Sequence, residues 1–218
     1  MKKRFHIHSL RSFVMIAAYF FIISMISAQY SPHPEIEGGK VYKISPQSIL
    51  SITGSTNVNQ FNCSCTEPMP AQIFYIDELD DEHCTTIFRE TFLSLRIQSL
   101  DCGNKMMNKD MYKALNASVH PNISIELLQV SLEKCDLSGT GNVTDRYAAL
   151  TRITLNGRSR DYWMKITARE TAPDQFHLVG GKSLCMSDFG ITPPTAALGM
   201  VKVKDEIRIS LDMKVEVE

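Results

Sequence analysis

The amino-acid sequence predicts an all-β fold: an antiparallel sheet of about eight strands, closed into a barrel, with one short α-helix. In residues 201–217 every even position is polar and eight of nine odd positions are apolar, with Asp205 as the exception. This alternation is typical of a strand with one dry and one wet face. Asn156-Gly157 joins two alternating runs, as in a tight hairpin. Barrel closure would remove the exposed edges of such a meander.

Strands are expected where apolar and polar residues alternate between turn signals. The alternation is weak over 58–62, and Gly54 marks a turn or bulge. The other expected strands cover residues 41–45, 49–53, 92–100, 121–127, 147–155, 161–168, 176–186 and 201–217.

The helix is expected within residues 104–116, where Met107, Met111 and Leu115 recur every four residues as an apolar stripe. Asn108 is the expected N-cap residue. Such a stripe usually packs against a core. Because methionine adapts to irregular shapes, it would also suit a lid over a ligand.

The N-terminal residues 1–28 have the pattern of a secretory signal peptide, with a basic start and a small residue, Ala28, at the expected cleavage site. Their apolar run, Phe13–Ile26, is shorter than the roughly 20 residues of a membrane span. An uncleaved anchor is the alternative. Residues 29–40 are expected to form a loose lead-in, and residues 41–218 the barrel domain.

The charge balance argues against a nucleic-acid partner. Residues 1–28 carry four basic and no acidic residues, which leaves 19 basic against 24 acidic residues, a net charge of −5, from residue 29 onward. Nucleic-acid binding would favour a basic excess.

Six cysteines behind a signal peptide predict disulfide bonds. Because Cys63 and Cys65 share one strand parity, each is expected to reach a different partner, and Cys102 is the first candidate for one of them. A metal site at Cys63-Ser64-Cys65 is the alternative, but structural zinc sites usually have wider spacing. The disulfide candidates are Cys63, Cys65, Cys84, Cys102, Cys135 and Cys185.

A Cys-rich loop insertion is expected at about residues 62–84. It contains Pro68, Pro70 and the acidic run 77–82, and it lacks a sustained period, although residues 73–76 could add a short strand.

Four blocks of the sequence resemble the YceI-like proteins. Their order and spacing over residues 41–213 carry the resemblance. They are ITGSTNVNQF at 52–61; DCGN at 101–104 continuing through MNKDMYKAL at 107–115 to His120-Pro121; LNGRSR at 155–160; and MSDFGITPP at 186–194 followed by LGMVKVKDEI at 198–207. The chain departs from the family pattern in its longer segment 62–84 and at Asn156 and Arg158.

The resemblance implies a lipocalin-like, extended antiparallel β-barrel secreted to the bacterial periplasm, with an apolar channel that holds a polyisoprenoid or similar lipid. It implies no metal, no cofactor and no catalysis. The alternating strands nominate lumen-facing side chains, which would instead fill the barrel if it holds no cavity. They are Leu95, Ile97, Met111, Ile125, Leu127, Trp163, Phe189, Ile191, Val203, Ile207, Ile209 and Leu211.

Three charged residues are candidates for the barrel mouth, where they could contact a lipid head group: Arg96, Asp188 and Asp205. Asp205 interrupts the dry face of its strand, so it is expected near water or a partner such as Arg96.

The expected function is non-catalytic lipid binding, with a hydrophobic lipid as partner and transient membrane or protein contact as a further possibility. One alternative is a filled barrel that docks a partner protein through residues 62–84. Another is a lipid-modifying enzyme that uses Asp188 or Asp205, although the chain has no Gly-x-Ser-x-Gly, His-Glu-x-x-His or phosphate-loop motif. The sequence leaves the oligomeric state open.

Overall fold

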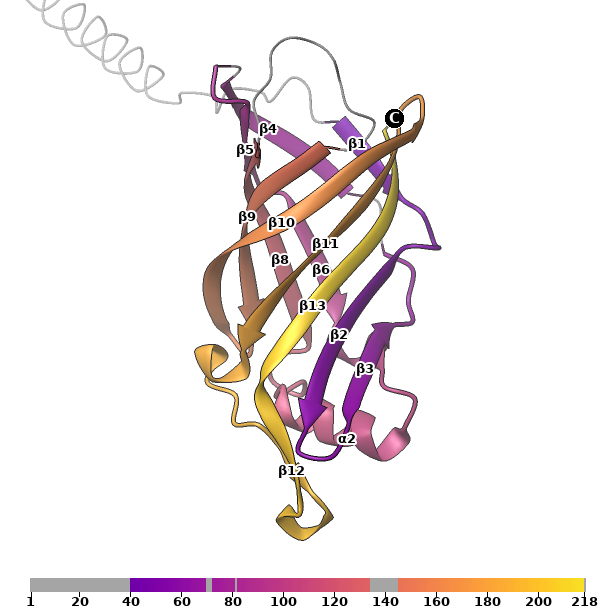
Figure 1. Cartoon of the computed structure of the whole chain (residues 1–218), viewed down its shortest axis with the longest axis vertical. Coiled ribbons are helices and arrows are strands. Elements are labelled where there is room, and N and C mark those ends of the chain that lie inside the picture. The colour runs from indigo at the N-terminus through magenta and orange to yellow at the C-terminus, as the bar shows by residue number, and fades with distance from the viewer. Residues whose placement is uncertain (1–39, 70–71, 81, 134–144, 218) are drawn as a thin grey trace, which may run out of the picture. The chain divides into compact units, whose positions relative to one another are not determined.

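The computed structural model describes residues 40–69, 72–80, 82–133 and 145–217 (Figure 1). The expected signal peptide and nearly all of the lead-in lie outside these ranges. Residues Gly38–Glu218 form one compact unit that contains every strand pairing described below. In the described part of the chain, no helix is long and apolar enough to span a bilayer.

One wall of the barrel consists of five long strands, each paired antiparallel with the next. They are β8 (Asn122–Leu132), β9 (Asp145–Leu155), β10 (Arg158–Ala172), β11 (Gln175–Cys185) and β13 (Val201–Val217). The Asn156-Gly157 hairpin between β9 and β10 is confirmed. Both turn residues have positive φ, 50° and 70°, as a tight hairpin turn requires.

The other wall consists of shorter strands that run in three interrupted lines. β1 and β2 both pair with β13, β4 and β3 pair with β1 and β2, and β5 and β6 both pair with β8. β4–β5 and β3–β7 pairs complete this wall. Its strands are β1 (Lys40–Ile44), β2 (Ile49–Thr56), β3 (Gln60–Cys65), β4 (Gln72–Asp80), β5 (Thr85–Arg89), β6 (Phe92–Arg96) and β7 (Leu100–Asp101).

These pairings close the sheet, because the ring runs from β13 through β1, β4 and β5 to β8. The described residues contain thirteen labelled strands, more than the expected eight. The excess arises because each line of the second wall is broken into two or three strands and because the short strand β12 pairs with β13, so that eight lines surround the barrel axis. The predicted closed antiparallel barrel is confirmed.

The remaining elements gather near the strand ends. Helix α2 (Lys105–Ala114) follows β7. The 3-10 helix η1 (Ile97–Ser99) joins β6 to β7, and η2 (Met186–Phe189), β12 (Thr195–Ala196) and η3 (Ala197–Gly199) lie between β11 and β13.

The predicted helix is confirmed, but its expected cap is wrong. Asn104, not Asn108, is the N-cap, and its side-chain oxygen accepts hydrogen bonds from the backbone N–H groups of Met106 and Met107. Asn108 instead donates to Asp101 and accepts from the Cys102 backbone, so it ties α2 to the preceding strand.

The prediction of a loop over residues 62–84 is also wrong, because most of this segment is paired strand in β3 and β4. The β4–β5 ladder shifts register between Ile76 and Glu78. A bulge there interrupts the period of two, which hid the strand from a search for alternation.

The alternation of β13 is confirmed. Ile207, Ile209, Leu211 and Val215 are buried, whereas the lysines and acids at even positions are exposed. Ile207, Ile209 and Leu211 belong to one core cluster inside the barrel, together with residues from β2, β8, β9 and η2.

Candidate functional site

A cavity of about 260 Å3 lies inside the barrel between the strands and helix α2. Its wall has few polar members, of which Asn104 and Asp110 come from the N-cap and body of α2 and Thr56 comes from β2. The apolar wall residues from the strands are Ile52, Phe61, Ile123, Ile153, Leu155, Ala196, Val201, Val203, Ile207 and Ile209.

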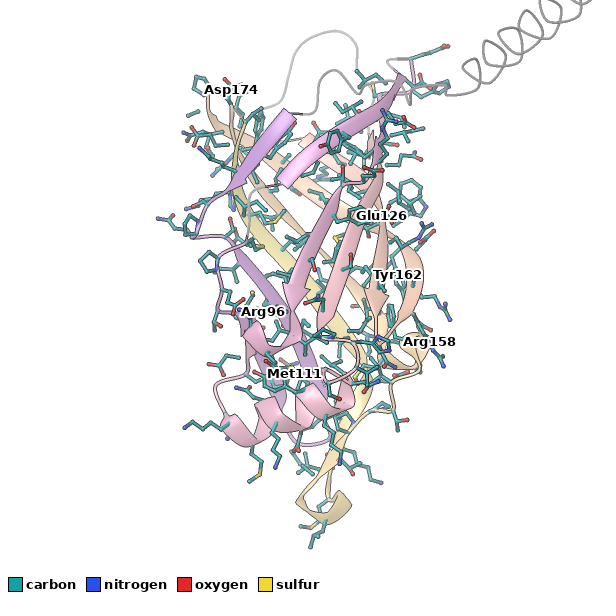
Figure 2. The ribbon with its side chains drawn as sticks, turned by 180° about the vertical axis from the view of Figure 1, so that it is seen from behind. Arg96, Met111, Glu126, Arg158, Tyr162 and Asp174 are labelled. Carbon is teal, nitrogen blue, oxygen red and sulfur yellow. A yellow bond between two sulfur atoms is a disulfide. The ribbon has the colours of Figure 1, made fainter. Side chains whose placement is uncertain are left out.

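Helix α2 covers this cavity with methionines. Met106, Met107 and Met111 contribute to the wall, yet α2 has no fully buried residue. Figure 2 shows Met111 on the side of α2 that faces the strands. The helix is held by Tyr112, whose hydroxyl donates to the backbone carbonyl groups of Gln98 and Leu100 at 3.1 and 2.9 Å. Helix α2 is therefore attached to the barrel through Tyr112, and its side chains that face the cavity are only half-buried.

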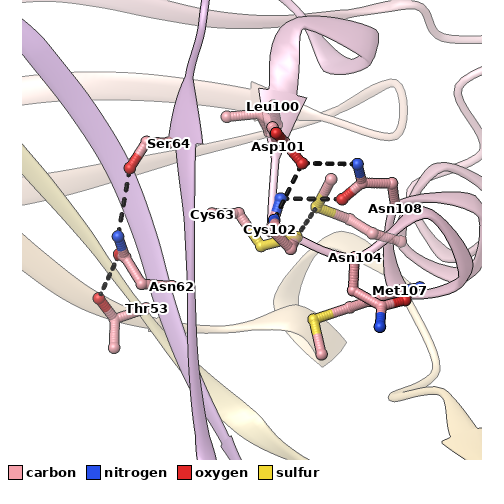
Figure 3. Close-up of a disulfide and its surroundings, with 12 residues drawn as sticks. Thr53, Asn62, Cys63, Ser64, Leu100, Asp101, Cys102, Asn104, Met107 and Asn108 are labelled. Atoms are coloured by element: carbon pink, nitrogen blue, oxygen red, sulfur yellow. Dashed lines mark hydrogen bonds between the residues drawn. A yellow bond between two sulfur atoms is a disulfide. The ribbon is translucent and has the colours of Figure 1, made fainter.

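A disulfide forms part of the cavity wall. Cys63 on β3 is bonded to Cys102, two residues before the cap of α2, as Figure 3 shows. The expectation that Cys102 bonds a residue of the Cys-x-Cys pair is confirmed. The Cys102 Sγ atom lies 3.7 Å from the Met111 Sδ atom, so the disulfide also contacts the helix that it anchors.

The other disulfide candidates have different outcomes. Cys65 and Cys185 are free thiols. Cys84 is disulfide-bonded, and Cys135 lies outside the described residues. Within the part of the chain that the structure describes, no group of three His, Cys, Asp or Glu side chains is arranged to hold a metal ion.

Four of the expected lumen residues lie on the cavity wall: Met111, Val203, Ile207 and Ile209. Another six are buried in the packed core away from the cavity, and Leu127 is half-buried. The barrel is thus filled in one part and hollow in another. The six core residues are Leu95, Ile97, Ile125, Phe189, Ile191 and Leu211.

The expectation for Trp163 is wrong. Its side chain is 50 % exposed, whereas its neighbour Met164 is buried. Tyr162, Trp163 and Met164 are consecutive apolar residues, so the alternation of β10 is ambiguous at this point. The side chains of β10 that point into the barrel are those at even positions, such as Met164.

Several residues of the cavity wall were not among the expected lumen residues. Ile52, Ile153 and Leu155 alternate with polar neighbours, so their parity was a usable signal. Asp110, however, lies on the wall only because of the way α2 docks, and no local pattern indicates that docking.

The three expected mouth residues do not meet at the cavity. Arg96 is exposed and pairs with Glu67 instead of Asp205. Asp188 accepts a hydrogen bond from the Tyr162 hydroxyl at 2.9 Å. Burial, followed by this bond to Asp188, raises the pKa of Tyr162 to about 12.

Asp205 accepts hydrogen bonds from the backbone N–H of Ser187, at 2.8 Å, and from the Ser187 hydroxyl. The hydroxyl bond is the main reason why the pKa of Asp205 lies below its ordinary value. From Val203 to Ile207 β13 advances four residues, while its partner β2 advances two, from Thr56 to Gly54. Two extra residues preserve the odd parity and allow Asp205 to turn toward η2.

The YceI-like domain model matches residues 72–215. The chain belongs to the YceI-like family. The match covers most of the barrel, including helix α2 and all of β13 except its last two residues.

Two solved structures have the same fold as this YceI-like protein. One is BcnA of Burkholderia cenocepacia, with 15 % sequence identity, a TM-score of 0.56, and coverage of 79 % of this chain and 99 % of that chain. The other is a polyisoprenoid binding domain from Saccharophagus degradans implicated in plant cell wall breakdown, with 9 % identity, a TM-score of 0.57, and coverage of 81 % and 98 %. No curated protein matches the chain.

The YceI-like chain departs from the expected family pattern at Asn156 and Arg158, and both residues have structural contacts. Asn156 accepts from Asn116 and donates to the Phe189 carbonyl, so it links the end of α2 to η2. The Arg158 guanidinium lies over Gly190, where a Cβ atom would be 2.5 Å from its Cζ atom. These contacts hold the segments around the cavity without changing its wall.

Proposed function

We propose that this protein binds an apolar chain, a polyisoprenoid or a fatty-acyl lipid, in the cavity beneath α2, and that it does so without catalysis. The observation that carries the proposal is a cavity of about 260 Å3 with an almost entirely apolar wall. Such cavities, with a few polar groups, are typical of small-molecule sites.

The wall chemistry supports a lipid more than a polar metabolite. Burying about 400 Å2 of ligand surface would contribute roughly 10 kcal/mol before entropy costs. The fold relative from Saccharophagus degradans is described as a polyisoprenoid binding domain, which favours an isoprenoid among apolar chains.

The size of the cavity indicates how a long ligand would fit. Ligand pockets commonly have volumes of about 300 to 1,000 Å3. At about 260 Å3, the cavity has room for one segment of a lipid chain when α2 is in its present position. A longer ligand needs more space. An outward movement of α2 would provide it, and the half-buried methionines of this helix can adapt to such a movement.

The proposed location is the periplasm or the cell exterior. The predicted signal peptide and the Cys63–Cys102 disulfide support it, because disulfides persist in oxidising compartments.

The two alternatives have less support. A completely filled barrel disagrees with the cavity. An enzyme using Asp205 would require a carboxylate in the cavity with a raised pKa, whereas hydrogen bonding to Ser187 lowers the pKa of Asp205. Neither Asp188 nor Asp205 is a wall residue.

The test is mass spectrometry of an organic-solvent extract of protein purified without detergent. We expect an isoprenoid or acyl lipid at a near-stoichiometric level. Val203→Trp, which fills the cavity, should lose it, whereas Val179→Trp on the outer face of β11 should keep it. Equal lipid in both variants, or no lipid above an unrelated control protein, would refute the proposal.

A further inference from the structure

Exposed apolar side chains gather at the end of the barrel that carries the cavity. Among the described residues, the four most exposed large apolar side chains are Leu198 (104 %), Met106 (75 %), Met200 (70 %) and Val58 (68 %). They come from the β12–β13 hairpin, α2 and the β2–β3 turn. Isolated apolar residues on a surface are ordinary, but a group of the most exposed ones indicates an interaction site.

These three segments are neighbours. The Asn57 side chain donates to the Met200 carbonyl at 2.9 Å and accepts from the Lys202 backbone at 2.8 Å, so the β2–β3 turn is bonded to the hairpin. Met106 and Val201 line the same cavity. Figure 1 shows α2 and the hairpin at one end of the barrel and β4 and β5 at the other.

We define the basic end as residues 54–62, 104–119 and 190–204. It contains five lysines and one acidic residue, a net charge of +4, although the chain from residue 29 carries −5. All five lysines are exposed, and three of them, at positions 105, 109 and 113, form one stripe along α2. The acidic run 77–82 begins in β4, at the opposite end.

Leu198 has no evident structural reason to be where it is. Its side chain is fully exposed, and its backbone is left-handed, with φ 57° and ψ 31°, a conformation that costs a residue such as leucine about 1 kcal/mol or more. Contact with an apolar phase would bury this side chain and offset the cost of its backbone conformation.

We propose that the basic end docks on the surface of an anionic lipid bilayer, with Leu198 and Met200 inserted among the acyl chains and the lysines over the phosphates. Apolar side chains ringed by lysine are the combination that binds such a surface. A bilayer fits better than a protein partner because the negative charge of its surface extends over all five lysines of the basic end. The inference deepens the proposed function, since it places the cavity against the source of its lipid.

The test is co-flotation of the compact unit, residues 38–218, with vesicles of phosphatidylcholine and phosphatidylglycerol in equal parts. This unit contains the entire barrel and lacks the apolar N-terminal stretch, which could bind vesicles by itself. We expect binding to these vesicles, weaker binding at high salt, and little binding to pure phosphatidylcholine.

Two sets of variants separate the contributions. Replacing Lys105, Lys109 and Lys113 by Gln should weaken binding by roughly a hundredfold, at about 1 kcal/mol for each lysine. The matched control, Arg146→Gln with Lys165→Gln and Arg169→Gln, makes the same charge change on β9 and β10 and should have a smaller effect. Leu198→Asn with Met200→Gln should also reduce binding, whereas Leu79→Asn at the other end should not.

The docking proposal fails if the wild-type unit does not float, or if the basic-end variants bind as well as their controls. It also fails if vesicle binding is absent and sedimentation shows a dimer that the basic-end variants dissociate. The basic end would then join two copies of the chain. These outcomes are independent of lipid extraction. Protein that carries lipid but does not float would overturn the docking proposal alone.

Discussion

Asp205 on β13 holds η2 in place through Ser187, whose backbone N–H and hydroxyl both donate to its carboxylate. The residue that interrupts the apolar face of the longest strand thus satisfies a backbone donor of a neighbouring 3-10 helix. It connects the two-residue bulge of β13 to the segment that carries Met186, a cavity-wall residue.

We expect Asp205→Asn to lower the free energy of unfolding at neutral pH. The pKa of Asp205 is lowered in the folded state from its ordinary value of 3.8, chiefly by the Ser187 hydroxyl. Its contribution is therefore complete above that value and is lost as the pH falls through the folded-state pKa. Urea unfolding at several pH values should show the difference between the wild type and the variant narrowing in acid. Glu206→Gln, an exposed neighbour, is the control, and a gap that is the same at every pH would contradict the prediction.

Cys185 should react slowly with thiol reagents. Burial is the main cause that raises its pKa, followed by the negative charges of Asp205 and Asp188, so less thiolate forms at a given pH. In a Cys65→Ser background, the pH profile of alkylation should have a higher midpoint for the folded protein than for the urea-unfolded protein. Adding Asp205→Asn should lower that midpoint. Identical folded and unfolded profiles would rule the explanation out.

Removal of the Cys63–Cys102 disulfide should destabilise the barrel by about 4 kcal/mol, because the bond closes a loop with a sequence separation of 39 residues. The variant is Cys63→Ser with Cys102→Ser, measured by urea unfolding. The control pair, Cys65→Ser with Cys185→Ser, replaces the two free thiols. It should change stability by less than about 1 kcal/mol. Equal losses in the two pairs would show that the cross-link contributes little.

Asn104→Ala should cost about 1 kcal/mol and loosen the first turn of α2, because the side chain caps the N–H groups of Met106 and Met107. Hydrogen exchange of those amides should accelerate more than exchange in β9. Lys109→Ala, an exposed change on the same helix, should leave exchange unchanged or slower, since alanine favours helix. Unchanged protection in Asn104→Ala would indicate that tertiary contacts alone hold the turn.

The sequence was sufficient for elements whose signal is local. The β13 alternation, the Asn156-Gly157 hairpin and the methionine stripe of α2 each depend on residues close together in the chain. For the same reason Val203, Ile207 and Ile209 could be assigned to the inner face, since all three share the parity of one long strand.

Elements that depend on distant partners were less predictable. The bulge at Ile76–Glu78 disguised β4, whose place is set by pairing with β1 and β5. Trp163 was misassigned because three consecutive apolar residues do not define a parity. Asp205 was expected near the barrel mouth or beside Arg96, but its partner is Ser187, which lies 18 residues away and carries no signal of the contact.

The interrupted strand lines give the barrel two walls of different stiffness. The β8–β13 wall is built from unbroken strands of 11 to 17 residues, whereas the lines on the other side are broken between β1 and β2, β3 and β4, and β5 and β6. At two of these breaks isolated hydrogen bonds replace the ladder: the Ser45 N–H donates to the Lys214 carbonyl of β13, and the Leu127 N–H of β8 donates to the Thr91 carbonyl. Bending is therefore expected at these breaks sooner than in the continuous wall. A long guest molecule could therefore widen the barrel at these breaks, while the wall of unbroken strands keeps its register.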